Sequence, residues 1–225
     1  MNKPYIICHM MTSVDGRIDC AMTAQLAGEP EYYSTLDALN APTRISGRVT
    51  AETELTGGGK FVPKSDEQLN KTDFTKNADA DSYNIVVDTK GTLRWSRENG
   101  SSFPHLIITS EQVTKNYLDY LNEQGISWIA TGEKHVDLKH AMEILADEFN
   151  VERLAIVGGG KINGGFLDAG LIDEISILIG AGADGRSNQP SLFDGRPESR
   201  RPIALKLKDV KSYDDGAVWL RYLVK

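Results

Sequence analysis

The sequence is poor in cysteine, has no long apolar run and carries no excess of positive charge. Its 225 residues include only Cys8 and Cys20, which form no CxxC pair and are too few for a secreted disulfide scaffold. No stretch approaches the roughly 18 apolar residues of a membrane span, and the N-terminus shows no signal-peptide pattern. We therefore expect a cytoplasmic protein with no membrane partner.

The charge balance argues against nucleic acid as the main partner. Lys and Arg number 25 against 32 Asp and Glu, a formal net charge of −7, and no basic patch dominates. The four histidines have no metal-ligand spacing, so no metal site is expected. With 40% apolar and 25% charged residues, the composition is that of an ordinary globular protein. A small molecule is the expected partner.

Strand and helix patterns alternate along most of the chain, which predicts an α/β fold. This alternation favours a mostly parallel twisted sheet with helices on both faces, in one domain spanning 1–225. The last strand follows a turn signal and is expected to lie antiparallel at an edge. Strands are predicted at 5–11, 43–47, 83–88, 105–110, 126–131, 153–157, 174–180 and 217–224, and helices at 31–39, 111–125, 138–149 and 161–171.

One segment breaks the regular order. Residues 60–82 are polar and charged, with scattered apolar residues and no period. Loops of this length are unusual inside a compact domain. The segment is therefore expected to be a mobile functional flap or partly disordered.

The stretch "AIVGGGKINGG" (155–165) runs from a predicted strand through three glycines into a predicted helix. A Walker-type phosphate loop is excluded because Ile162, not Ser or Thr, follows Lys161, and the GxGxxG pattern fails at Asn163. Glycines at this place let the backbone approach a ligand and expose helix N–H groups to an anion. Alternatively, the turn only packs the helix on the sheet. These residues alone leave both interpretations open.

Several motifs together resemble one family. "TSVDG" after the first strand resembles the turn of riboflavin-biosynthesis reductase domains, and "SGRVT" resembles the Gly-Arg-x-Thr turn of dihydrofolate reductases. "GGGKINGGFLDAGLIDEISI", "DGRSNQPSLFDG" and "AVWLRY" are similar to segments of the same reductases. The resemblance covers nearly the whole chain in order. It is to the C-terminal reductase half of the bifunctional deaminase-reductase.

This resemblance implies a dihydrofolate-reductase-like fold, binding of NADPH and transfer of a hydride. It implies 5-amino-6-(5-phosphoribosylamino)uracil as the substrate, whose ribosyl group is reduced to a ribityl group, and it implies a homodimer. The positions that match the family's cofactor contacts are Gly47, Arg48, Thr50, Asp88, Thr109, Ser110, Gly158, Gly159, Gly160, Lys161 and Ile162.

The candidate catalytic residues are two carboxylates, Asp15 and Glu54, either of which would supply a proton after hydride transfer. Ser13 and Tyr33 are the candidate substrate contacts. Tyr32 is the alternative to Tyr33 as the ring that stacks on a pyrimidine. Several candidates have an ordinary alternative role. Asp15 would bond the backbone of its own turn, the tyrosine would pack in the core, and Asp88 would be a solvated strand-end carboxylate.

The substrate side departs from the family pattern. Val157 stands where these reductases often have Glu, "AETEL" replaces an Asp-Asp-Pro segment, and Arg44 is a weak candidate for a substrate-phosphate contact. Two alternatives therefore remain beside the riboflavin-pathway reductase. One is a reductase of the same fold acting on another small molecule, and the other is a nucleotide-binding module without turnover.

Overall fold

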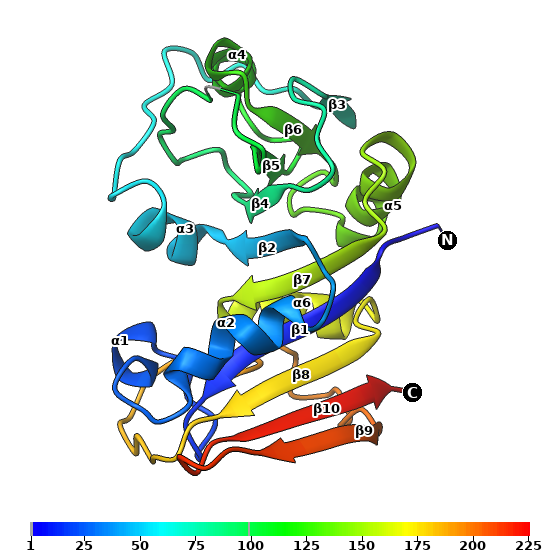
Figure 1. Cartoon of the computed structure of the whole chain (residues 1–225). Helices are drawn as coiled ribbons and strands as arrows, with labels where there is room; N and C mark the ends of the chain where they lie inside the picture. Colours follow the sequence, from blue (N-terminus) through cyan, green and yellow to red (C-terminus); the bar gives the residue numbers. More distant parts are fainter. Residues whose placement is uncertain (1, 99) are drawn as a thin grey trace. The chain divides into compact units, whose positions relative to one another are not determined.

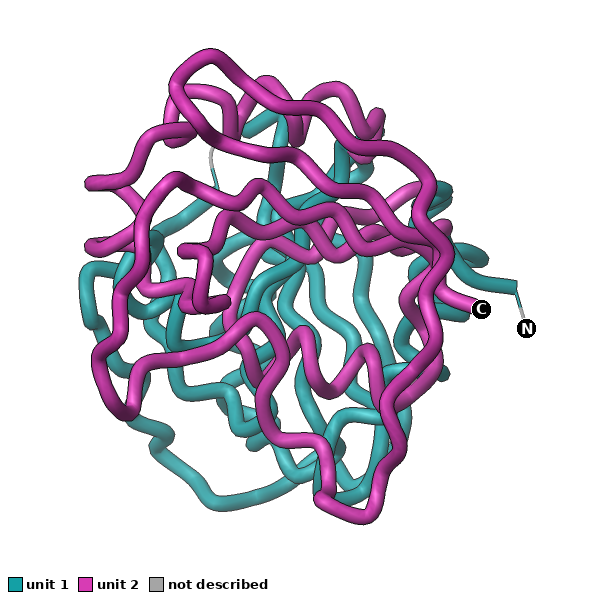
Figure 2. The backbone as a smooth tube through the Cα atoms, turned by 90° about the horizontal axis from the view of Figure 1, so that it is seen from below, with its two compact units in different colours: residues 1–4, 42–152 teal, residues 5–41, 153–225 magenta. Residues whose placement is uncertain are grey.

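The computed structural model describes residues 2–98 and 100–225, which form two compact units. Unit 1 comprises Met1–Pro4 and Pro42–Glu152, and unit 2 comprises Tyr5–Ala41 and Arg153–Lys225. Figure 1 labels the elements and Figure 2 colours the two units. Each unit is therefore built from two separate stretches of chain and is described below by itself.

Unit 1 is a mainly parallel sheet in the order β3-β6-β5-β4-β2. Strands β2, β4, β5 and β6 run parallel, and only the short β3 pairs antiparallel, with β6. Its elements are β2 (Thr43–Gly47), α3 (Arg48–Glu54), β3 (Asp73–Thr75), β4 (Asn84–Val87), β5 (His105–Thr109), α4 (Lys115–Gln124), β6 (Ser127–Ala130) and α5 (Leu138–Glu148).

Helices α4 and α5 cover opposite faces of this sheet. Tyr117 of α4 packs with Val86 and Ile107 in one buried cluster. Phe149, which ends α5, meets the ring of Tyr83 at 5.6 Å between centroids. Tyr83 precedes Val86 by three positions and so faces the other side of the pleat. This confirms the expected helices on both faces.

Unit 2 orders its strands β7-β1-β8-β10-β9. Strands β7, β1 and β8 are parallel, whereas β10 and β9 are antiparallel. Its elements are β1 (Tyr5–Thr12), α1 (Cys20–Thr23), α2 (Glu29–Asp37), β7 (Arg153–Gly158), α6 (Gly160–Asp168), β8 (Glu174–Ile179), β9 (Leu205–Ser212) and β10 (Val218–Val224). The antiparallel C-terminal strand is thus confirmed, but β9, which the sequence patterns did not reveal, occupies the edge beyond it.

One layer of the unit 2 core lies between its sheet and α2. Leu36 of α2 packs with Ile7, Leu178 and Trp219, while α6 lies behind β1 in Figure 1. His9 is fully buried in this layer, its Nδ1 lying 2.9 Å from the Ser176 hydroxyl, which also accepts from the indole N–H of Trp219. The buried polar groups therefore satisfy one another.

The polar segment 60–82 is bonded to neighbouring elements at several points. Its backbone forms β3 and donates from Leu69 to the carbonyl of Val113. The side chain of Asn77 donates to the carbonyl of Ile126 and to Asn122. These bonds tie the segment to β6 and α4. The segment is therefore attached at these points, and a role as a mobile functional flap stays a prediction.

The helix lengths and the two cysteines bear on where the protein could reside. No helix among the described residues is long and apolar enough to cross a membrane. Cys8 is buried and Cys20 exposed, no disulfide joins them in the described residues, and burial raises the pKa of the Cys8 thiol. Cys8 therefore behaves as a small core hydrophobe, as expected.

Candidate cofactor and substrate site

In unit 2 the glycine turn joins a parallel strand directly to a helix. β7 ends at Gly158, Gly159 adopts a φ of +84°, and α6 begins at Gly160. The amide of Ile162 donates back to the carbonyl of Gly159. The amides of Gly160 and Lys161 have no acceptor within residues 2–98 and 100–225, and the Lys161 side chain is exposed. The first turn of α6 can therefore accept an anion.

Two glycines of α6 serve packing. A Cβ at Gly160 would lie 2.2 Å from the carbonyl oxygen of Ser191, and one at Gly164 would lie 1.9 Å from that of Asp194. Both distances are far below van der Waals contact. The segment 191–194 thus sits directly on α6 only because these positions lack side chains. For these two glycines the packing interpretation is the correct one.

Hydrogen bonds fix the segment on the helix. The amide of Asp194 donates to the carbonyl of Gly160 at 2.9 Å, and its carboxylate accepts from the Ser191 hydroxyl at 2.5 Å. Asn163, fully buried in α6, donates from its side-chain amide to the carbonyl of Leu192. The start of α6 is therefore held rigidly before any ligand arrives.

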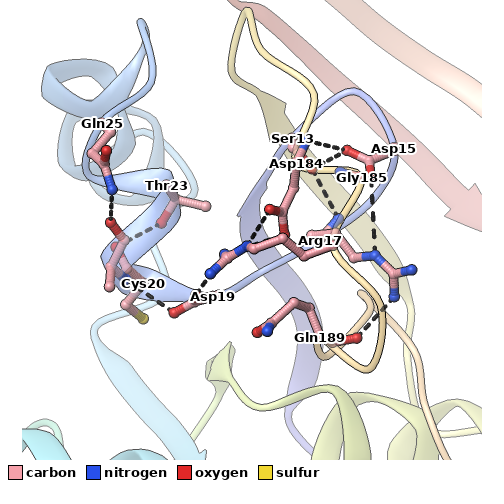
Figure 3. A network of polar contacts seen from close by, with 12 residues as sticks. Ser13, Asp15, Arg17, Asp19, Cys20, Thr23, Gln25, Asp184, Gly185 and Gln189 are labelled. Carbon is pink, nitrogen blue, oxygen red and sulfur yellow. Dashed lines mark hydrogen bonds and ion pairs between the residues drawn. The ribbon is translucent and has the colours of Figure 1, made fainter.

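The turn after β1 is built around Asp15 (Figure 3). The Ser13 hydroxyl donates to Asp15 at 2.7 Å, and the amides of Asp184 and Gly185 donate at 2.8 and 3.0 Å. The Ser13 hydrogen bond, followed by these two amides, holds the pKa of Asp15 well below its usual range. Asp15 is therefore ionised at neutral pH and joins two segments. This favours an anchoring role for Asp15 over proton donation. Its hydrogen-bond partners lie both in its own turn and far away in the sequence.

Arg17 was not among the site residues predicted from the sequence. Its guanidinium donates to the carbonyl of Gln189 at 2.8 Å, while its Nε is buried without a hydrogen bond in the described part of the chain, 3.9 Å from an Asp15 oxygen. The signal was present, because Arg17 follows the quoted turn "TSVDG" directly. The backbone amide of Arg17 donates to the hydroxyl of the predicted substrate contact Ser13 at 3.1 Å.

The two adjacent tyrosines of α2 differ in surroundings. Tyr32 stacks on His9 with centroids 4.9 Å apart and packs against the core, whereas Tyr33 is 60% exposed. The core-packing alternative therefore applies to Tyr32 alone. Val157, at the position that departs from the family pattern, is partly buried and packs against the same core cluster.

In unit 1 the predicted cofactor residues follow the carboxyl ends of neighbouring strands. Gly47 pairs with Val87, and Val87 with Ile108, so the residues after β2, β4 and β5 share one edge of the sheet. Gly47 precedes α3 and Arg48 is its first residue. Ligands of α/β sheets bind at such an edge.

The polar side chains near this edge differ in solvent exposure and in their contacts. Arg48 pairs with Glu52 one helical turn later, with 42% of its side chain exposed, and Thr50 is half-buried. Glu54, the last residue of α3, is exposed. Arg44 lies instead toward the amino end of β2, its guanidinium 5.8 Å from the Phe103 ring. Of these, Arg48 remains the best placed cation for a cofactor phosphate.

Asp88, Thr109 and Ser110 are turned inward. All three are fully buried. The Asp88 carboxylate accepts from the amides of Thr92 and Leu93 at 2.6 and 2.9 Å, and the Thr109 and Ser110 hydroxyls donate to backbone carbonyls. The expectation that Asp88 is a solvated carboxylate is wrong, because it closes its own loop. These groups shape the edge and present no surface to a ribose.

The chain matches one family over almost its full length. The family model described as the RibD C-terminal domain matches residues 4–220. The chain belongs to the RibD C-terminal domain family. This confirms the resemblance to riboflavin-biosynthesis reductases.

Two curated relatives of this RibD-type chain carry the same name, 2,5-diamino-6-ribosylamino-4(3H)-pyrimidinone 5′-phosphate reductase. That of Aquifex aeolicus is 25% identical over 201 residues, covering 87% of this chain and 84% of the relative. That of Methanothermobacter thermautotrophicus is 24% identical and covers 99% of each. By contrast, the chain spans 50% of the riboflavin biosynthesis protein RibD of Chlamydia muridarum.

Solved structures confirm the fold. A pyrimidine reductase-like protein of Corynebacterium diphtheriae superposes with a TM-score of 0.73 at 20% identity, covering 100% of this chain and 93% of that one. RibD of Acinetobacter baumannii gives 0.68 at 19% identity, covering 100% of this chain and 59% of its own. The dihydrofolate-reductase-like α/β architecture expected from the RibD-type motifs is therefore confirmed.

Proposed function

We propose that this chain is an NADPH-dependent reductase of riboflavin biosynthesis that converts the ribosyl group of 2,5-diamino-6-ribosylamino-4(3H)-pyrimidinone 5′-phosphate to a ribityl group. The family match over residues 4–220 carries this proposal. The relatives matched over most of their own length are named for this substrate. The resemblance of the sequence implied 5-amino-6-(5-phosphoribosylamino)uracil, the deaminated counterpart of this compound. It serves as the comparison substrate.

The first turn of α6 fits the cofactor's pyrophosphate. The open amides of Gly160 and Lys161, the left-handed backbone at Gly159 and the exposed lysine suit an anion. In unit 1 we propose that Arg48 meets the 2′-phosphate, which requires it to exchange Glu52 for that partner. When bound, the nicotinamide supplies a hydride. Arg48 is the reason for proposing NADPH over NADH.

The chain's own residues have a positioning role in this reaction. The acceptor carbon is C1′ of the ring-opened sugar, which is joined to the pyrimidine as an imine; C1′ gains the hydride, the C=N double bond becomes a single bond, and the imine nitrogen gains the proton. Asp15 is ionised and holds the segment 184–185, so the proton comes from water or from Glu54. We propose that exposed Tyr33 stacks on the pyrimidine and that Ser13 and Arg17 orient the substrate.

Loss of NADPH absorbance tests the proposal. The purified chain is given each of the two pyrimidine phosphates, with dihydrofolate and NADH as controls. We expect sustained NADPH oxidation with the diamino substrate and slower turnover with the uracil. Binding of NADPH without turnover on either pyrimidine would overturn the proposal. A reductase of another substrate, which Val157 favours, would oxidise NADPH only with a different acceptor.

We also propose a cytoplasmic homodimer. Every residue of β9 is exposed, and Leu205, Leu207 and Val210 are 38%, 52% and 55% exposed along this edge. A second copy covering this strand would bury them and remove a free sheet edge. Light scattering after size exclusion should report a dimer that Leu207→Glu converts to a monomer, whereas Lys206→Glu does not. Two cysteines that form no disulfide in the described residues favour a reducing compartment.

A further inference from the structure

A cavity lies in unit 1, at the amino end of β5. It has a volume of about 210 Å³, and His105, which lines it, is the first residue of that strand. Thr109 and Ser110 lie at the opposite end, so the cavity is separate from the edge that carries the predicted cofactor residues. Its lining comprises Leu55, Thr56, Arg94, Trp95, Ser96, Arg97, Glu98 and His105.

The cavity has more positive than negative groups. Arg94 and Arg97 are both exposed, and neither has an ion-pair partner in the part of the chain that the structure describes. The one carboxylate of the lining, Glu98, is already engaged, because it accepts from the backbone amide of His105 at 3.1 Å and from that residue's ring Nδ1. Two guanidinium groups therefore remain open to an anion.

His105 is incompletely satisfied. Since Glu98 accepts from Nδ1–H, Nε2 is the ring nitrogen left over, and it is buried with no hydrogen-bond partner among the described residues. Buried polar atoms are rarely unpaired, so the orphaned nitrogen points to a missing partner. A phosphate group can close this bond in either state once the ring shifts to expose Nε2, because its P–OH donates to a neutral Nε2 and its anionic oxygen accepts from an imidazolium.

The wall that carries the arginines is fixed in advance. The Tyr120 hydroxyl contacts the backbone amide and carbonyl of Trp95 at 2.6 and 2.5 Å. The amide of Arg94 donates to Gly59, and that of Glu98 to Gln124. The backbone of 94–98 is thus hydrogen-bonded on both sides. Ligand binding therefore loses little conformational entropy in ordering this segment.

We propose that this cavity binds the phosphate group of a small molecule. Arg94 and Arg97 supply the charge-assisted hydrogen bonds, His105 Nε2 completes its bonding on the ligand, and Ser96 and Thr56 add hydroxyl groups. The cavity volume fits a phosphate or a compact phosphate ester. This site is independent of the proposed reductase reaction.

Trp95 provides the measurement, because it lines the cavity and its ring lies 4.9 Å from that of His105. The indole N–H signal of Trp95, assigned with Trp95→Phe, is followed by NMR during titration with inorganic phosphate and separately with ribose 5-phosphate, at constant ionic strength. We expect a saturable shift of this signal with both ligands. In Arg94→Gln/Arg97→Gln, phosphate should bind at least about tenfold more weakly.

The control is Lys134→Gln, which removes an exposed cation elsewhere in unit 1 and should leave the affinity within about twofold. Thermal melting shows that each variant is folded. The proposal is overturned if the Trp95 signal does not saturate, or if the double variant and the control bind phosphate equally. Phosphate that shifts only signals of the α6 turn would likewise contradict it.

Discussion

The tetrapeptide GGGK occurs twice in this chain, once in each unit, and the two copies have different roles. Residues 57–60 follow α3, and residues 158–161 join β7 to α6. The second glycines are alike, since Gly58 and Gly159 have φ values of +80° and +84°. The third glycines differ, because a Cβ at Gly59 meets nothing closer than 3.4 Å, whereas one at Gly160 would meet Ser191 at 2.2 Å.

The comparison separates what glycine does from what its surroundings add. The positive φ is a local property that both copies share. Only the copy at 158–161 lies between a strand and a helix and packs against the segment 191–194. Its close packing and its open amides follow from these surroundings. The following predictions test this separation at each position.

The largest effect is expected at the third glycine. Gly160→Ala forces the segment 191–194 off α6 and should cost about 1–3 kcal/mol of unfolding free energy, as overpacking does. Gly59→Ala, the same change at the same place in the other copy, should stay within about 0.5 kcal/mol. Denaturant unfolding of both variants measures this. Equal costs would show that the loop contact at α6 has no energetic weight.

The second glycine separates strain from ligand binding. Gly159→Val and Gly58→Val both place a branched side chain at positive φ, so both should lose stability. Only Gly159→Val should weaken NADPH binding, by about tenfold or more, because it distorts the turn that holds the pyrophosphate. Titration calorimetry on the folded variants gives both dissociation constants. An unchanged constant for Gly159→Val would remove the cofactor from this turn.

The lysines provide a smaller contrast. Lys161 is exposed beside the open amides of α6, whereas Lys60 lies 3.9 Å from Glu52 in unit 1. Lys161→Gln should weaken NADPH binding about two- to fivefold, as expected for one exposed cation. The loss should shrink as salt is added. Lys60→Gln should have no effect on the affinity, and an equal loss in both variants would indicate a general charge effect.

The smallest effect is a pH-dependent one at the turn after β1. The folded-state pKa of Asp15 is lowered by Ser13 and the amides of Asp184 and Gly185, so its contribution is present above the unfolded-state pKa and lost as pH falls. Asp15→Asn should therefore melt at a lower temperature than wild type at pH 7. The difference should narrow below about pH 4. A constant difference across pH would contradict the charged hydrogen bonds, and Asp66→Asn is the exposed control.

The sequence predicted most elements because apolar runs mark buried strands wherever they pair. It failed for elements that depend on a partner. Strand β9 alternates Leu and Lys with every residue exposed and exists through its pairing with β10, and β3 is three residues held by β6. The Leu–Lys alternation of β9 is itself a strand signal that was not used, whereas the three residues of β3 carry little signal of their own.

The site shows the same limit. The patterns placed the glycine turn between a strand and a helix, as the structure has it, but they predicted only a turn after Gly47, where α3 begins. The sequence could not assign Asp15 to amides at 184 and 185, which lie 169 and 170 positions away. Nor could it show that the Asp88 carboxylate accepts hydrogen bonds from the loop that follows it. In sequence, an Asp at a strand end gives the same pattern whether it is solvated or buried.

Transfer of deuterium from the cofactor is the most direct test of the reductase assignment. The chain is incubated with NADPH deuterated at the transferable position of the nicotinamide and with 2,5-diamino-6-ribosylamino-4(3H)-pyrimidinone 5′-phosphate, and the product is examined by mass spectrometry and NMR. We predict a ribityl product that carries a single deuterium at C1′. Recovery of the unreduced ribosyl compound, or of a reduced product without deuterium, would contradict the account.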